Sequence, residues 1–217
     1  MDKQTFDPNF FKVSWIVDLL EMEESKTAFV LSNYQPTEKE KKYRAFGVCA
    51  APGKRMAKGR DGKTHSRNIE VDVKFFRECL KVDVIICLLD RYELRTIGVD
   101  LDVYKKACVK NGITLINYPI VEMGVPFHDP SEFDKQLIRP LLENLCNRKR
   151  VICHCRGGIG RAGTVASCAV LRLGLASNSK MAISTIRKLR DPRAVESKKQ
   201  EDYIKAYADV KGCLDIA

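Results

Sequence analysis

The chain has 217 residues, of which 45% are hydrophobic and 30% charged, and this composition suits a folded domain with a sizeable core rather than a disordered chain. Its formal net charge of +10 at pH 7 favours acidic ligands such as phosphates or phosphoproteins, although a solvated basic surface explains the excess equally well. No apolar stretch approaches the length of a membrane span and no secretory signal is visible, so we expect no membrane span and a cytoplasmic or nuclear location.

Nine cysteines occur, an odd number. Most lie in apolar runs, and none shows the paired spacing of a zinc site. We therefore expect a reducing compartment, mostly buried free thiols and no metal.

The first part of the chain is divided by composition. Residues 1–42 alternate short apolar runs with charge, and we interpret them as an N-terminal extension that adds a strand or wraps the domain at 43–217. A strand-like run at 44–52 follows. The stretch from Gly53 to Ser66 is rich in Gly, Lys and Arg, which predicts an exposed, mobile loop.

From about residue 68, the hydrophobic pattern alternates between helix and strand periods. The order is helix 68–80, strand 82–89, helix 101–112, strand 113–120, helix 131–146, strand 150–155, a helix from near Arg161, and helices 178–190 and 197–210. Strands as apolar as VDVIICLL and RVICHC are expected where helices cover both faces of a sheet. This pattern predicts one α/β domain with a central, mostly parallel sheet of four or five strands flanked by helices.

A cysteine followed six positions later by an arginine occurs twice in the chain. In the first match, Cys49 to Arg55, Pro52 removes a backbone N–H donor and no helix start follows. We interpret that match as a strand end and a loop.

The second match, Cys155 to Arg161, lies between a buried strand and an apolar-periodic helix. Its glycines let successive backbone N–H groups face inward as an anion-binding nest, and the helix N-terminus adds positive potential. A phosphate dianion fits this environment. The predicted phosphate-binding residues are Arg156, Gly157, Gly158, Ile159, Gly160 and Arg161.

The side chains of this loop suit a thiolate that acts on a bound phosphate. The inward N–H donors and positive charge favour a thiolate at Cys155. The planar guanidinium of Arg161 can bind two phosphate oxygens. We also expect the hydroxyl of Thr164 to lie where it can donate to the sulfur.

The segment HCRGGIGRAGT resembles the His-Cys-x5-Arg-Ser/Thr signature of the protein tyrosine phosphatase superfamily. Residues 45–210 as a whole resemble its kinase-associated branch, near the dual-specificity phosphatases. The resemblance implies a cysteine-phosphatase fold without metal or organic cofactor. It implies Cys155 as the nucleophile that forms a phosphocysteine, Arg161 as the phosphate clamp, Thr164 as an aid to thiolate departure, and a phosphorylated kinase as a partner.

The general acid is less well defined by the sequence. The family places an Asp on the loop after the strand that here reads NYPI, whereas this chain has Glu122 there, 33 positions before Cys155. The extra methylene can misplace the proton by about 1 Å, which is enough to cost 100-fold in rate. Asp129 on the same segment is the alternative, and we interpret Asp134 as a surface carboxylate of the next helix.

Two further residues have supporting interpretations. Gln200 occupies the position where related phosphatases often carry a residue that faces the hydrolytic water, and an exposed helix position is an equal alternative. We expect His154 to order the loop or the core rather than to act as a base.

The leading hypothesis is a phosphoprotein phosphatase acting on phosphotyrosine, phosphoserine or phosphothreonine through phosphocysteine, without a nucleic-acid partner. Arg156 and the net charge suggest one alternative, a phosphoinositide or other non-protein phosphate substrate. Glu122 in place of Asp suggests another, a phosphate-binding pseudophosphatase with low turnover.

Overall fold

The structure is a computed structural model that describes residues 11–18, 45–59, 62 and 64–214. Most of the extension predicted at 1–42 therefore lies outside the described residues.

Five strands form the central sheet: β1 (Ser14–Asp18), β2 (Ala45–Cys49), β5 (Val84–Cys87), β6 (Thr114–Asn117) and β7 (Arg150–His154). Their order is β1-β2-β7-β5-β6, and only the β1–β2 pair of this sheet is antiparallel. All residues of β2 and β5 are buried, as expected for strands covered on both faces. The predicted mostly parallel sheet is confirmed, and a strand from the extension joins its edge.

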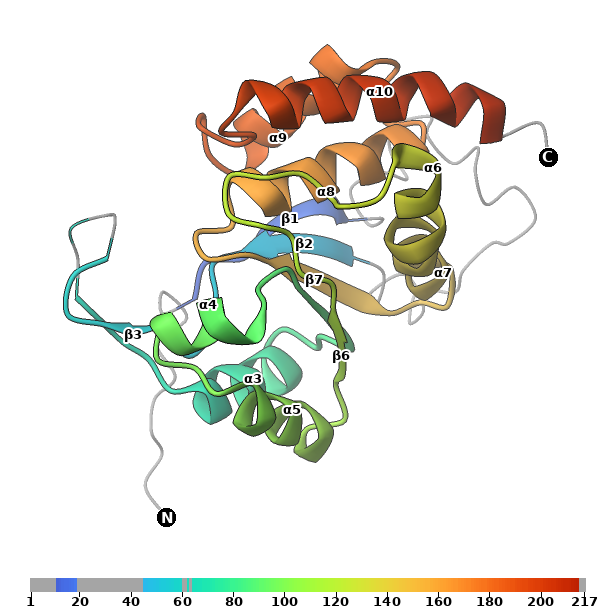
Figure 1. The fold of residues 1–217 in the computed structure, drawn as a ribbon. Helices are drawn as coiled ribbons and strands as arrows, with labels where there is room; N and C mark the ends of the chain where they lie inside the picture. Colours follow the sequence, from blue (N-terminus) through green and yellow to red (C-terminus); the bar gives the residue numbers. More distant parts are fainter. Residues whose placement is uncertain (1–10, 19–44, 60–61, 63, 215–217) are drawn as a thin grey trace.

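Helices cover both faces of the sheet. They are α3 (Ile69–Glu78), α4 (Arg91–Thr96), α5 (Leu101–Lys110), α6 (Pro130–Phe133), the π-helical η3 (Asp134–Ile138), α7 (Arg139–Cys146), α8 (Gly160–Arg172), α9 (Ser179–Leu189) and α10 (Lys198–Leu214). Figure 1 shows α3 and α5 on one side of the sheet and α8, α9 and α10 on the other. Each of the first twelve residues of α8 is buried, because this helix lies between the sheet and the outer helices.

The segment after β2 corrects part of the prediction of an exposed loop at 53–66. Most of its described residues are exposed as predicted, but its start is buried and part of it forms strands. Two short strands, β3 (Arg55–Met56) and β4 (His65–Ser66), pair there in an antiparallel manner. Gly53 is buried, and Lys54 is only 8% exposed. The physical reason is the buried carboxylate of Asp72 on α3, which accepts the Gly53 N–H at 2.7 Å and holds the start of the segment against the domain.

The carboxyl ends of three parallel strands meet at one edge of the sheet. Cys49 of β2 and Cys87 of β5 both lie opposite His154 of β7. Residues that follow His154 therefore emerge between two neighbouring strand ends, where open α/β sheets commonly bind ligands.

The described cysteines are free thiols, and six of these eight are buried: Cys49, Cys87, Cys108, Cys153, Cys155 and Cys168. This agrees with the expectation of mostly buried free thiols. Within the described residues, no group of three His, Cys, Asp or Glu side chains could hold a metal ion. No helix in the same part of the chain is long and apolar enough to span a membrane.

Candidate active site

The loop between β7 and α8 wraps around the sulfur of Cys155. The N–H of Gly158 points at Cys155 Sγ, with 3.2 Å between nitrogen and sulfur. Gly158 has a φ of +68°, and a Cβ at this position would lie 2.1 Å from the carbonyl oxygen of Cys49. Glycine is therefore required here for both conformation and space, and the predicted inward-facing amide is present.

The other cysteine–arginine match has no such loop. Cys49 ends β2, the chain continues to Arg55 in β3 without a helix, and the Arg55 side chain donates to the carbonyl oxygen of Arg67. The interpretation as a strand end and loop is confirmed.

Arg161, the second residue of α8, is 4% exposed. Its Nη1 donates to Glu93 Oε2 at 2.8 Å and to the carbonyl oxygen of Ile120 at 2.7 Å. Its Nε and Nη2 have no hydrogen-bond partner among the described residues, so these two nitrogens can bind an anion. Burial opposes the charge of Arg161, but the bond to Glu93 and the nearby Cys155 outweigh it and raise the pKa of Arg161.

Glu93 lies on α4, a short helix missed in the sequence analysis. Asp90 caps this helix by accepting the Glu93 N–H at 2.7 Å. The Asp-x-x-Glu spacing is a helix-start signal that could have revealed the helix. It would not have shown that Glu93 reaches Arg161, 68 positions away.

Arg190 is a second residue that the sequence analysis missed. Its Nε donates to the carbonyl oxygen of Gly158 at 2.9 Å, and its Nη2 donates to that of Gly157 at 3.1 Å. Arg190 follows α9 directly. A basic residue at a helix C-terminus is too common to have revealed this contact.

Glu122 lies on a tight turn after β6. The Gly124 N–H donates to the Val121 carbonyl at 2.8 Å, and Met123 adopts a positive φ of 58°. The Glu122 carboxylate lies 3.8 Å from the guanidinium of Arg156, whose side chain is 24% exposed. The structure thus brings Glu122 and Arg156 together at the edge of the loop formed by residues 155–161.

Gln200 stabilises the turn at 121–124 by a hydrogen bond. It is fully buried, its Nε2 donates to the Gly124 carbonyl at 3.0 Å, and its Oε1 accepts the Glu196 N–H. The alternative of an exposed helix position is therefore wrong. Gln200 does not line the cavity that contains Cys155, and its hydrogen bond to Gly124 supports a role in holding the turn at 121–124.

The other two carboxylates of the segment have structural roles. Asp129 caps α6 by accepting the N–H groups of Ser131 and Glu132, and it does not line the cavity. The interpretation of Asp134 as a surface carboxylate is wrong. Asp134 is fully buried. Its carboxylate is stabilised there by a hydrogen bond from Tyr207 and by ion pairs with Arg139 and Arg172.

Thr164 and His154 are both buried beside the loop. The Thr164 hydroxyl donates to the Gly160 carbonyl at 3.1 Å rather than to the sulfur, because it follows the helix backbone. His154 Nε2 lies 3.0 Å from the hydroxyl of Tyr104. Burial is the main cause that lowers the pKa of His154 to about 4, so a neutral ordering residue is the role that its surroundings support.

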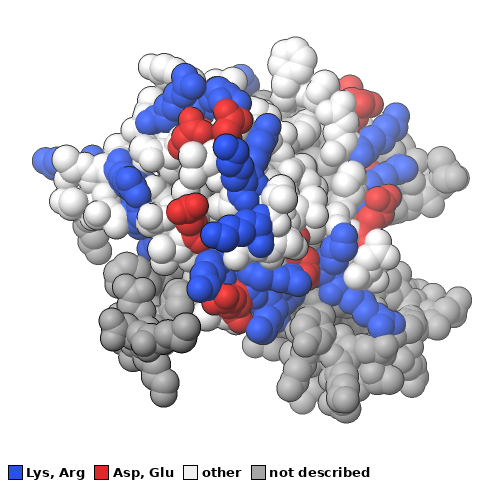
Figure 2. Space-filling view, turned by 90° about the horizontal axis from the view of Figure 1, so that it is seen from below, with Lys and Arg blue, Asp and Glu red and all other residues white. Residues whose placement is uncertain are grey.

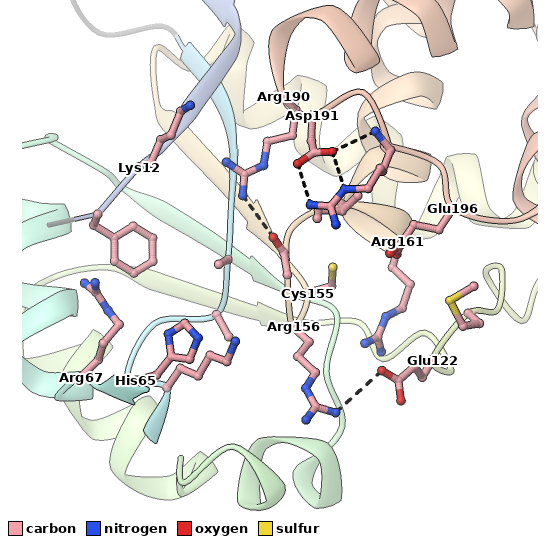
Figure 3. A pocket seen from close by; sticks show the side chains of 18 residues that line it. Lys12, His65, Arg67, Glu122, Cys155, Arg156, Arg161, Arg190, Asp191 and Glu196 are labelled. Carbon is pink, nitrogen blue, oxygen red and sulfur yellow. Dashed lines mark hydrogen bonds and ion pairs between the residues drawn. The ribbon is translucent and has the colours of Figure 1, made fainter. Parts of the chain in front are cut away.

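Cys155, Arg156, Ile159, Arg161 and Glu122 line one cavity of about 760 Å³. Figure 3 shows the Cys155 sulfur between Arg161 and Glu122 on one side and Arg190 on the other. A phosphate ester that enters meets the Cys155 sulfur, a buried guanidinium and a carboxyl group on a facing loop. This is the chemistry of the cysteine-dependent phosphatases.

Comparison with known proteins gives the same class. The family described as "Swiss Army Knife protein, DSP-PTPase phosphatase domain" matches residues 80–204. Cyclin-dependent kinase inhibitor 3 of Homo sapiens is 30% identical over 166 residues, which are 76% of this chain and 72% of the relative. Its Sus scrofa counterpart is 31% identical over the same shares. The chain belongs to the dual-specificity group of the protein tyrosine phosphatases and is a cysteine-dependent protein phosphatase.

Solved phosphatase structures match the fold of this chain. Kinase associated phosphatase, crystallised with its catalytic-site cysteine replaced by serine, matches with a TM-score of 0.69 and 25% identity over 93% of this chain and 96% of that one. PTPMT1 matches with a TM-score of 0.61 and 17% identity over 79% of this chain and 94% of that one, which shows the fold alone. The phosphoinositide and pseudophosphatase alternatives are not favoured by the relatives in sequence.

Proposed function

We propose that Cys155 is the nucleophile of this phosphatase and that Arg161 binds the phosphoryl oxygens of phosphotyrosine, phosphoserine or phosphothreonine in a protein. The observation that carries the assignment is the Gly158 N–H aimed at Cys155 Sγ beside the buried Arg161. The names of the relatives in sequence and structure support a phosphorylated kinase as substrate.

In the first step, the Cys155 thiolate attacks phosphorus, so that an S–P bond forms as the ester P–O bond breaks. The leaving oxygen takes a proton from the Glu122 carboxylic acid. Gly158 N–H and Arg161 stabilise the charge on the transferring phosphoryl group, because fixed donors and a guanidinium in a water-poor site need little reorganisation.

In the second step, water attacks the phosphorus of phosphocysteine while the Glu122 carboxylate accepts its proton. The S–P bond breaks, the thiolate is restored and inorganic phosphate leaves. Gln200 and the turn at 121–124 position Glu122 for both proton transfers.

Turnover of phosphopeptides by wild type and Cys155→Ser tests the assignment. Serine keeps the shape of the site but is a much weaker nucleophile, so the variant should bind phosphopeptide without measurable hydrolysis. Cys153→Ser is a matched control, because Cys153 is buried in β7 and does not line the cavity. Turnover of Cys155→Ser at the wild-type rate would refute the assignment.

A further inference from the structure

Glu122 stands at a position where the family resemblance implies the shorter Asp. Its side chain is 36% exposed, so packing alone leaves the carboxyl group room to move. The longer side chain also has one more rotatable bond, and holding it in one conformation costs more rotamer entropy. Because a displacement of about 1 Å can cost 100-fold in rate, a group that holds this carboxyl group would contribute to catalysis.

Arg156 is placed to hold it. This residue directly follows the Cys155 nucleophile, and its Nη1 lies 3.8 Å from Glu122 Oε1. Figure 3 shows the two side chains pointing toward one another below the Cys155 sulfur. Both line the cavity, and the Arg156 side chain is only 24% exposed. Partial burial makes the attraction between these opposite charges stronger than it is between fully solvated groups.

The Arg156 guanidinium is also held on its other side. Its Nη2 lies 3.7 Å from the sulfur of Met56, which belongs to β3. The start of β3 is fixed to the domain, because the Arg55 N–H donates to the Ile97 carbonyl at 2.7 Å. The guanidinium therefore lies between the Met56 sulfur and the Glu122 carboxylate, and it connects the loop that carries the nucleophile to the turn that carries the acid.

The charge of Arg156 matters most in the first step of the reaction. When Glu122 gives its proton to the leaving oxygen, it becomes a carboxylate, and a neighbouring cation stabilises that anion. A guanidinium carries only hydrogen-bond donors. It therefore pairs with the oxygen of Glu122 that has no proton and leaves the proton on the other oxygen, from which it can be transferred.

We propose that Arg156 is a positioning residue for the general acid: it holds the Glu122 carboxyl group beside the nucleophile and stabilises its charge after proton transfer. This role differs from that of Arg161, which binds the phosphoryl oxygens. The inference rests on the proposed function, because Glu122 must be the proton donor.

Kinetics with two leaving groups test this role. Arg156→Met should lower kcat/KM for a phosphotyrosine peptide by about tenfold, which is part of the 100-fold that a displaced acid can cost. On p-nitrophenyl phosphate, whose more acidic leaving group needs less protonation, the loss should be about twofold. Arg156→Lys keeps the positive charge and should recover most of the activity toward the peptide.

A double-mutant cycle shows whether Arg156 acts through Glu122. In a Glu122→Gln background, Arg156→Met should lower kcat/KM for the peptide by less than about twofold, because the acid that Arg156 positions is already absent. An equal loss in both backgrounds would overturn the proposal. An equal loss on both substrates would overturn it as well, since Arg156 would then act on phosphate binding.

A control separates this ion pair from the general positive field of the protein. Figure 2 shows Lys and Arg side chains across one face of the molecule, and such charges draw anionic substrates toward it. Arg95→Met makes the same change in the last turn of α4, at an exposed position that does not line the cavity. It should keep the wild-type ratio of kcat/KM between the two substrates.

The outcomes distinguish this inference from the proposed function. Wild-type kcat/KM for the peptide in Arg156→Met, beside a large loss in Glu122→Gln, would overturn the positioning role alone. No loss in Glu122→Gln would remove Glu122 as the acid and count against the proposed mechanism itself. Thermal unfolding shows whether each variant is folded, and Arg156→Gln gives the same contrast if Arg156→Met does not fold.

Discussion

Arg190 donates from Nη2 to the carbonyl oxygen of Gly157, at 3.1 Å. That carbonyl and the Gly158 N–H belong to one planar trans peptide unit, so they point in opposite directions. The N–H lies 3.2 Å from Cys155 Sγ. Arg190 also donates to the carbonyl oxygen of Gly158. By holding both oxygens, it fixes the direction in which the Gly158 amide faces Cys155 Sγ.

Arg190→Met should therefore reduce phosphate binding and catalysis. We expect kcat/KM to fall about 10- to 100-fold, which is at most the rate loss that follows removal of one transition-state hydrogen-bond donor. The inhibition constant of vanadate should rise about tenfold. Lys188→Met is the control, since it removes an exposed charge from the last turn of α9, two positions before Arg190. A lowered Tm with unchanged vanadate inhibition would show that Arg190 only stabilises the fold.

Glu122→Gln should lower kcat on phosphotyrosine peptides by about 100-fold or more, because the glutamine amide cannot donate the proton that the leaving oxygen needs. The effect should be smaller on p-nitrophenyl phosphate, whose leaving group needs less protonation. Asp129→Asn should keep wild-type kcat, because asparagine also caps α6 and the side chain lies outside the cavity. The reverse pattern would make Asp129 the general acid.

Gly158→Ala should destabilise the protein by about 3 kcal/mol or more, because the new methyl would lie 2.1 Å from the Cys49 carbonyl oxygen at a φ of +68°. Gly157→Ala is a close control for stability: its Cβ would meet no atom nearer than 3.7 Å, in the side chain of Ile159. Denaturant unfolding of the two variants measures the difference. Similar free energies of unfolding would contradict the tight packing of this loop.

His154 should make the stability depend on pH. Burial lowers its pKa to about 4 in the folded state, compared with 6.5 in the unfolded chain. As the pH falls below 6.5, the unfolded chain binds the proton first, so the free energy of unfolding decreases toward pH 4 and is insensitive to this group above 6.5. The loss should reach about 3 kcal/mol.

Urea unfolding of wild type and His154→Asn between pH 4 and 7.5 checks this contribution. The variant should lose less stability on acidification, because the remaining titratable groups are common to both proteins. Parallel curves would show that His154 is protonated at the same pH in both states.

Glu122 and the residues that hold its turn show which features the sequence alone does not predict. The position of Glu122 was predicted from a motif, but the sequence does not show that Gln200 holds its turn, and the exposed alternative for Gln200 proved wrong. Similarly, polar composition predicted an exposed segment at 53–66, whereas one buried carboxylate, Asp72, holds its start inside the domain.

By itself, the sequence determined the alternating α/β order and the loop from Cys155 to Arg161, because hydrophobic period, glycine spacing and helix start are local properties of consecutive residues. The tertiary structure decided which distant groups support this loop: Arg190, 32 positions from Gly158; Glu93, 68 from Arg161; and Gln200, 76 from Gly124. These contacts depend on how helices pack at the carboxyl edge of the sheet, and no local pattern encodes a hydrogen bond between segments that far apart.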